Sequence, residues 1–111
     1  MNIEFSECIL KIDGNPIVFE HPIISARTDG ELIYLIFDYI DFPKDMQANN
    51  LECIDSNGNF KWCAESPLNS PSSAFSNFIE FESKLVVGNF AGFNATINKA
   101  TGIIESTEFT K

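Results

Sequence analysis

One hairpin-like stretch decides the fold: Cys53-Ile54-Asp55-Ser56-Asn57-Gly58-Asn59-Phe60-Lys61-Trp62. Its centre, Asn57-Gly58, is typical of a two-residue hairpin turn, because both turn positions require positive φ. An apolar residue followed by Asp enters the turn, and an aromatic residue leaves it. If Asn57-Gly58 forms the turn, Cys53 lies opposite Trp62. Phe60 and Trp62 are then expected to share one buried face of the hairpin.

The same pattern recurs at a constant spacing along the chain. Gly14, Gly58 and Gly102 lie 44 residues apart, and an Ile followed by Asp or Asn enters each turn. A period in the low forties is typical of propeller blades or of stacked four-stranded units. The segments between turns are short and apolar, and no apolar run keeps a helical spacing over three turns. The sequence therefore predicts an all-β protein of about eight antiparallel strands.

The 111 residues are expected to form a single all-β domain, 1–111, because the length is close to the commonest domain size. Residues 31–40 are the most apolar segment and show little alternation, which predicts a central strand covered on both faces. Residues 65–74 contain two prolines and four serines and are predicted to be a linker. The strands are expected at 3–12, 17–20, 31–40, 51–64 (a hairpin), 75–82, 84–90, 93–98 and 103–109.

Residues 30–62 and 82–102 resemble blades of the quinoprotein-like (PQQ-type) propeller repeat. In that repeat a strand ends in Ile-Asp, a glycine turn follows, and the next strand ends in Trp. The central unit keeps the closing Trp62, whereas the last unit has Ser106 at that place and Asn98 in place of the aspartate. A closed propeller needs at least four blades. The resemblance therefore implies an antiparallel β-sandwich, or an open half-propeller that another copy completes, and it implies no cofactor because no cofactor-binding residue has a match.

Charge is distributed unevenly along the sequence. The chain has 16 acidic and 7 basic residues, a formal net charge of −9. Residues 1–55 hold eleven acids and three bases, whereas residues 56–111 are nearly balanced. This asymmetry predicts a face with a negative field, which repels nucleic acid and anionic membranes and attracts a basic protein. The alternative is that the acids only keep a small, Phe-rich domain in solution.

Catalytic and metal-binding patterns are absent from the sequence. His21 is the single histidine, and no nucleophile is placed beside it. The carboxylates at 38, 41 and 45 lack the glycine and closing Glu of a calcium loop. The three cysteines, Cys8, Cys53 and Cys63, have no metal-site or redox spacing and are expected to be reduced core residues. We therefore expect neither an enzyme nor a metal site.

The location expected from the sequence is the cytoplasm. The N-terminus is acidic and lacks the basic and apolar regions of a secretory signal. No stretch approaches the ~20 apolar residues of a membrane span. An odd number of cysteines without a disulfide framework agrees with a reducing compartment.

In size, acidity and half-propeller pattern the chain also resembles bacterial immunity proteins of contact-dependent growth-inhibition systems. This resemblance implies a non-enzymatic inhibitor that covers the active site of a cognate basic toxin, such as a nuclease. Aromatic anchors flanked by acids suit such an interface. The residues predicted to bind the partner are Asp38, Tyr39, Asp41, Phe42 and Asp45 in one loop, with Glu65, Glu80 and Glu82 as secondary candidates.

Three other interpretations of these residues stay open. Tyr39 and Phe42 could instead fix a crossover to the core. The chain could be a structural module that forms a homodimer through a sheet edge or face. It could also bind a small molecule in an aromatic pocket near Trp62 and Phe60.

Overall fold

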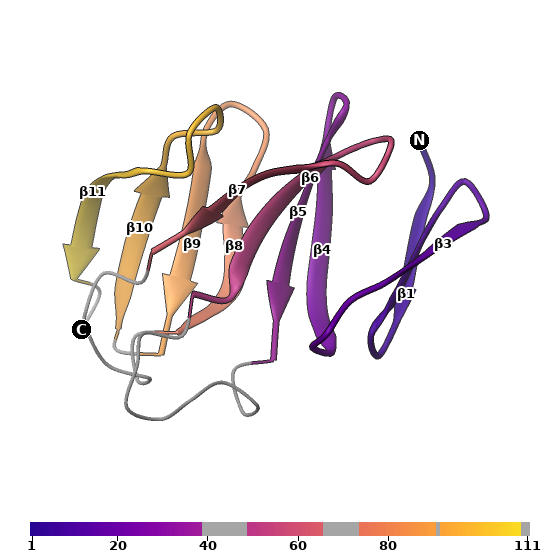
Figure 1. Cartoon of the computed structure of the whole chain (residues 1–111). Helices are drawn as coiled ribbons and strands as arrows, with labels where there is room; N and C mark the ends of the chain where they lie inside the picture. Colours follow the sequence, from indigo (N-terminus) through magenta and orange to yellow (C-terminus); the bar gives the residue numbers. More distant parts are fainter. Residues whose placement is uncertain (39–48, 66–73, 91, 110–111) are drawn as a thin grey trace.

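The computed structural model describes residues 1–38, 49–65, 74–90 and 92–109, and every regular element in these ranges is a β-strand. The strands form three antiparallel sheets (Figure 1). The first sheet is β1 (Ile3–Ser6), β2 (Ile9–Ile12) and β3 (Asn15–Val18); the middle sheet is β4 (Ile23–Asp29), β5 (Leu32–Phe37), β6 (Leu51–Asp55) and β7 (Phe60–Ala64); the last sheet is β8 (Phe75–Glu80), β9 (Leu85–Asn89), β10 (Phe93–Ile97) and β11 (Ile104–Phe109).

The all-β class is confirmed, and its strands outnumber those expected. Eleven strands are described where about eight were predicted. One reason is that residues 3–12 form two strands. Glu7 adopts a positive φ of 52°, which ends β1 and reverses the chain into β2. In each sheet, strands adjacent in the sequence are also neighbours in space, so the whole described chain is a series of meanders.

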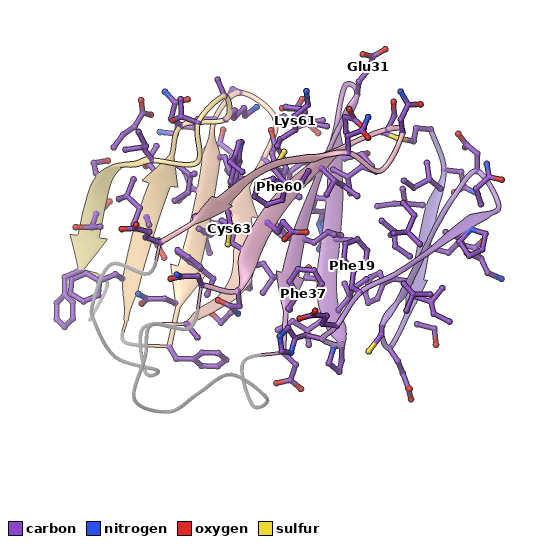
Figure 2. The ribbon with its side chains drawn as sticks, in the orientation of Figure 1. Phe19, Glu31, Phe37, Phe60, Lys61 and Cys63 are labelled. Carbon is purple, nitrogen blue, oxygen red and sulfur yellow. The ribbon has the colours of Figure 1, made fainter. Side chains whose placement is uncertain are left out.

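The middle sheet lies between the other two. On one face of β5, Ile33, Leu35 and Phe37 belong to a core cluster shared with the first sheet. Tyr34 and Ile36, on the opposite face, belong to a cluster shared with the last sheet. The expectation that this strand is covered on both sides is therefore confirmed. Figure 2 shows Phe37 beside Phe19, whose ring centroid is 5.3 Å away.

The three repeated glycines occupy equivalent turns. Gly14 lies between β2 and β3, Gly58 between β6 and β7, and Gly102 between β10 and β11, and all three have φ between 79° and 87°. The 44-residue repeat is thus a structural repeat. It makes β1–β3 the counterparts of β5–β7 and β9–β11, and it leaves β4 and β8 without a counterpart in the first sheet.

Neighbouring sheets meet through the same type of contact. A Cβ atom on Gly58 would lie 2.6 Å from Cδ1 of Ile17 in β3, and one on Gly102 would lie 2.5 Å from Cε3 of Trp62 in β7. Each apolar side chain therefore uses the space left by a glycine in the next sheet. The indole Nε1 of Trp62 also donates to the carbonyl oxygen of Lys99 at 2.7 Å.

The central hairpin differs from its predicted arrangement at one aromatic residue. Cys53 lies opposite Trp62 as expected, but a register shift then pairs Ile54 with Phe60. Lys61 is the extra residue of this bulge, which separates the faces that the two aromatic residues occupy. Trp62 is buried between sheets, whereas Phe60 is 62% exposed, so the prediction that both are buried is wrong for Phe60.

The Asp or Asn that enters each repeated turn has a structural role. Asp55 Oδ1 accepts hydrogen bonds from the backbone N–H groups of Asn57 and Asn59. Asn98 Oδ1 does the same for Ala100 and Thr101 in the turn between β10 and β11. Such side-chain bonds stabilise a turn by satisfying its amides.

We expect Asp55→Asn to preserve the β6–β7 turn, because Asn98 makes the equivalent hydrogen bonds in its own turn with an amide oxygen. Asp55→Ala removes the acceptor and should lower the melting temperature. The hydrogen bond from the Asn59 backbone lowers the pKa of the Asp55 carboxyl. The resulting stability is present above the ordinary Asp pKa of about 3.9 and is lost as the pH falls through the lowered value. Thermal unfolding at about pH 7 and pH 3 measures this loss. Asp55→Asn should not show the loss, and equal melting temperatures for both variants at neutral pH would contradict the turn role.

Candidate protein-binding surface

The turns and connections between the strands lie at two opposite ends of the three packed sheets. One end, called the turn end, has the turns after β2, β4, β6, β8 and β10 (Figure 1). The other end has the β1–β2 turn, the β3–β4 connection and the ends of β5 and β7. We call this second end the acidic end, defined by Glu7, Glu20, Asp38 and Glu65.

Backbone hydrogen bonds hold the acidic end together. The N–H of Ile23 donates to the carbonyl oxygen of Glu7 at 2.7 Å, and the N–H of Asp38 donates to that of Pro22 at 2.8 Å. The first and middle sheets are therefore tied at this end. Glu65 follows Ala64, which is paired with Leu51 at the same end of the middle sheet.

Both ends of the described structure carry acidic residues, and the two ends differ in where the basic residues lie. Glu7, Glu20 and Glu65 are exposed, and Asp38 is partly buried. Among the lysines and arginines that the structure describes, none lies at the acidic end. Lys84 and Lys99 are in turns at the opposite end, and the others lie on strands: Lys11, Arg27 and Lys61. The acidic end therefore presents carboxylates with no described Lys or Arg beside them, an arrangement that attracts a cationic partner.

One of the acids at the turn end, Asp29, takes part in contacts between sheets. Asp29 Oδ2 accepts hydrogen bonds from Tyr34 Oη at 3.2 Å and from Lys99 Nζ. The Lys99 ammonium also donates to the carbonyl oxygen of Glu82. Burial raises the pKa of the Tyr34 hydroxyl, so this group stays protonated and can donate. The network links the middle and last sheets.

The structure places the sequence-predicted binding residues in different regions. Asp38 and Glu65 lie at the same end of the middle sheet, after β5 and β7, with β6 between these two strands. Glu80 and Glu82 lie at the turn end, where Glu80 Oε1 accepts a hydrogen bond from Ser83. The described part of the chain thus does not join these four acids into one patch. The remaining predicted residues, Tyr39, Asp41, Phe42 and Asp45, lie outside the described residues.

An apolar surface on the first sheet was missed by the sequence analysis. Ile9 is 41% exposed and Val18 is 74% exposed, and they are directly opposite each other on β2 and β3. They line a hollow together with Glu4, Glu7 and Lys11. The signal in the sequence was the adjacent pairs Ile9-Leu10 and Ile17-Val18, because two neighbouring apolar residues give a strand two apolar faces.

The cysteines lack the features of reactive thiols. Burial raises the pKa of the Cys53 thiol to about 11. Local desolvation of the sulfur, together with the nearby Glu52 and Glu65 carboxylates, raises the pKa of the Cys63 thiol to about 11, although the Cys63 residue as a whole is exposed. Both thiols are protonated at neutral pH. They lie on adjacent strands, β6 and β7. Cys53 is buried as expected, but Cys63 is exposed, and the expectation that all three cysteines are core residues is wrong for this one.

The described residues contain no cluster of three potential metal ligands and no helix of the length and apolarity needed to cross a membrane. Trp62 and Phe60 also do not line a common pocket, because the bulge separates them and Trp62 is packed between sheets.

Comparison with known families gives one match. The model described as "Domain of unknown function (DUF7957)" matches residues 1–109, nearly the whole chain. No curated protein matches the sequence.

Proposed function

The chain belongs to this DUF7957 family, and we propose that it is an immunity protein that binds and neutralises a cationic toxin in the bacterial cytoplasm. The proposed target is the nuclease domain of a contact-dependent growth-inhibition toxin, whose active site the chain would cover. The observation that supports the proposal is an end of the molecule that carries Glu7, Glu20, Asp38 and Glu65 and none of the described lysines and arginines.

A nuclease is a suitable partner because of its own chemistry. It must hold phosphate groups with cationic side chains. A carboxylate-rich surface is attracted to the same groups, so it associates quickly and excludes the substrate. In such a complex the inhibitor needs no catalytic residue. Tyr39 and Phe42, which lie outside the described residues, remain the predicted aromatic anchors of the interface.

Charge reversal tests the proposal. We expect Glu7→Lys, Glu20→Lys and Glu65→Lys combined to reduce the association rate with the toxin by roughly tenfold or more at low salt. The matched control is Glu80→Lys with Glu82→Lys, two acids at the turn end, which should change the rate less. Growth rescue on coexpression with toxin domains encoded beside the gene, followed by binding kinetics, measures both effects.

Two outcomes would contradict this function. If no neighbouring toxin is neutralised and no complex forms, the chain is not their inhibitor. If the control variant slows association as much as the triple variant, the acidic end is not the steering surface. Circular dichroism of each variant shows whether the fold is retained.

A second candidate function is a structural module that forms a homodimer. It is favoured by the exposed side chains of Ile9 and Val18 on the outer face of the first sheet. Light scattering of the purified chain separates the candidates, because a tight dimer that buries this face favours the module.

A further inference from the structure

The first sheet lacks one strand of the structural repeat. Its three strands correspond to β5–β7 and β9–β11, so no strand occupies the place that β4 and β8 have in the other sheets. That place is beside β1. In the described part of the chain, β1 is paired only with β2 and forms an edge of its sheet. An edge of this kind offers backbone groups for pairing with another chain.

The hydrogen-bond pattern identifies which backbone groups face the open edge. The N–H of Asp13 donates to the carbonyl oxygen of Asn2, and Ile3 is opposite Ile12. The direction in which the backbone N–H and C=O groups point alternates along an antiparallel strand. The groups of Glu4 and Ser6 therefore point toward β2, as those of Asn2 do. The N–H and C=O groups of Ile3 and Phe5 therefore point away from β2, toward the open edge. β4 meets this edge further along, where Ile23 bonds to Glu7.

The side chains along β1 indicate what the missing strand would cover. Phe5 is opposite Leu10 and shares its inward face, yet Phe5 is 41% exposed while Leu10 is fully buried. A strand beside β1 would cover the open side of Phe5. Glu4 lies on the opposite face, across from Lys11 of β2. In an added strand, a basic residue directly opposite Glu4 would form a favourable pair of opposite charges.

A second copy of the chain is a poor occupant of this edge. The antiparallel register that pairs the outward backbone groups of Ile3 with those of Phe5 in another copy places Glu4 directly opposite Glu4. Like charges at directly opposed positions destabilise a strand pair. The negative charges of Glu4 and of nearby Glu7 favour a basic segment instead.

We infer that the free edge of β1 accepts an extended segment of a partner protein, added antiparallel to β1, that alternates apolar and basic residues. Its apolar side chains would lie beside Ile3 and Phe5, and a Lys or Arg would lie beside Glu4. Main-chain hydrogen bonds to Ile3 and Phe5 would supply affinity, and the alternating side chains would supply specificity, as in other cases of strand addition. The inference does not depend on the partner being a toxin.

A short peptide of alternating valine and lysine is the direct probe, and a valine–glutamate peptide is its control. With the ¹⁵N-labelled full chain, we expect saturable binding of the first peptide, and slower amide exchange at Ile3 and Phe5 than in the free protein. The glutamate peptide should bind at least tenfold more weakly, because its charge matches that of Glu4 and Glu7.

Variants at one position separate backbone pairing from side-chain contact. Phe5→Pro removes the outward N–H, which β2 does not use, and should abolish binding. Phe5→Val keeps that N–H and should retain binding. A peptide with N-methyl groups on alternate residues gives the same test without altering the protein. Failure of the valine–lysine peptide to bind, protection at another edge, equal binding of the N-methylated peptide, or a β1–β1 dimer in ultracentrifugation would each overturn the inference.

Discussion

Replacing Trp62 by alanine is expected to lower the free energy of unfolding by about 3–5 kcal/mol, the range for a large buried aromatic residue. The side chain is almost completely buried where the middle and last sheets meet. It packs on Gly102, lies 6.1 Å from the ring of Tyr34 between centroids, and donates to the carbonyl oxygen of Lys99. Alanine removes all three interactions and leaves a cavity between two sheets that are not otherwise hydrogen-bonded as a ladder.

Phe60→Ala is the matched control, because Phe60 lies on the same strand but is exposed. We expect it to change stability by about 0.5 kcal/mol or less. Trp62→Phe separates packing from hydrogen bonding: it keeps an aromatic ring but leaves the Lys99 carbonyl without the indole N–H, at a cost of roughly 1 kcal/mol or more. Urea denaturation measures all three variants. Equal losses for Trp62→Ala and Phe60→Ala would contradict the packing that the structure describes.

Replacing Asn50 by alanine is expected to cost about 3 kcal/mol or more, because it leaves several buried polar groups unsatisfied. Asn50 is fully buried at the start of β6. Its Nδ2 donates to the carbonyl oxygens of Phe37 and Phe75, both at 2.8 Å, and its Oδ1 accepts the N–H of Phe75 at 2.9 Å. One amide side chain thus joins β5 of the middle sheet to β8 of the last sheet.

The control for Asn50 is Asn57→Ala, which truncates an exposed asparagine in the β6–β7 turn and should cost much less. Hydrogen exchange gives a second readout. The amide of Phe75 should exchange faster in Asn50→Ala than in Asn57→Ala, because only the first variant removes its acceptor. Unchanged protection at Phe75 would contradict the role assigned to Asn50.

Local patterns in the sequence predicted the strands and the repeat well. The 44-residue spacing and the unbroken apolar run of β5 correspond to described features, whereas the turn at Asn57-Gly58 has positive φ at Gly58 but not at Asn57 and spans four residues between β6 and β7. The burial of Phe60 was predicted wrongly, because a bulge changes the face of every residue beyond it and depends on how Asp55 binds the turn amides. The bonds of Asn50 join residues 25 positions apart, and nothing in the local sequence indicates them.

The candidate surface was predictable only in part. Composition revealed an excess of acids in residues 1–55, but the end of the molecule at which each acid lies depends on the direction of its strand. Glu80 and Asp38 are both acids near strand ends, yet the meander places them at opposite ends of the molecule. The charge of the sequence therefore indicated the sign of the surface charge, and the strand topology determined where the acidic residues lie.

The order of the layers has a consequence for how the molecule opens. The two outer sheets share no core cluster with each other, and each has one with the middle sheet. Among contacts between sheets, each sheet is then stabilised only by those with an adjacent sheet, as each unit is in repeat proteins. Either outer sheet is able to detach while the remaining two stay folded, whereas disruption of the middle sheet removes the support of both. The middle sheet, β4 to β7, is thus expected to govern the cooperativity of unfolding, with the two outer sheets as its separable units.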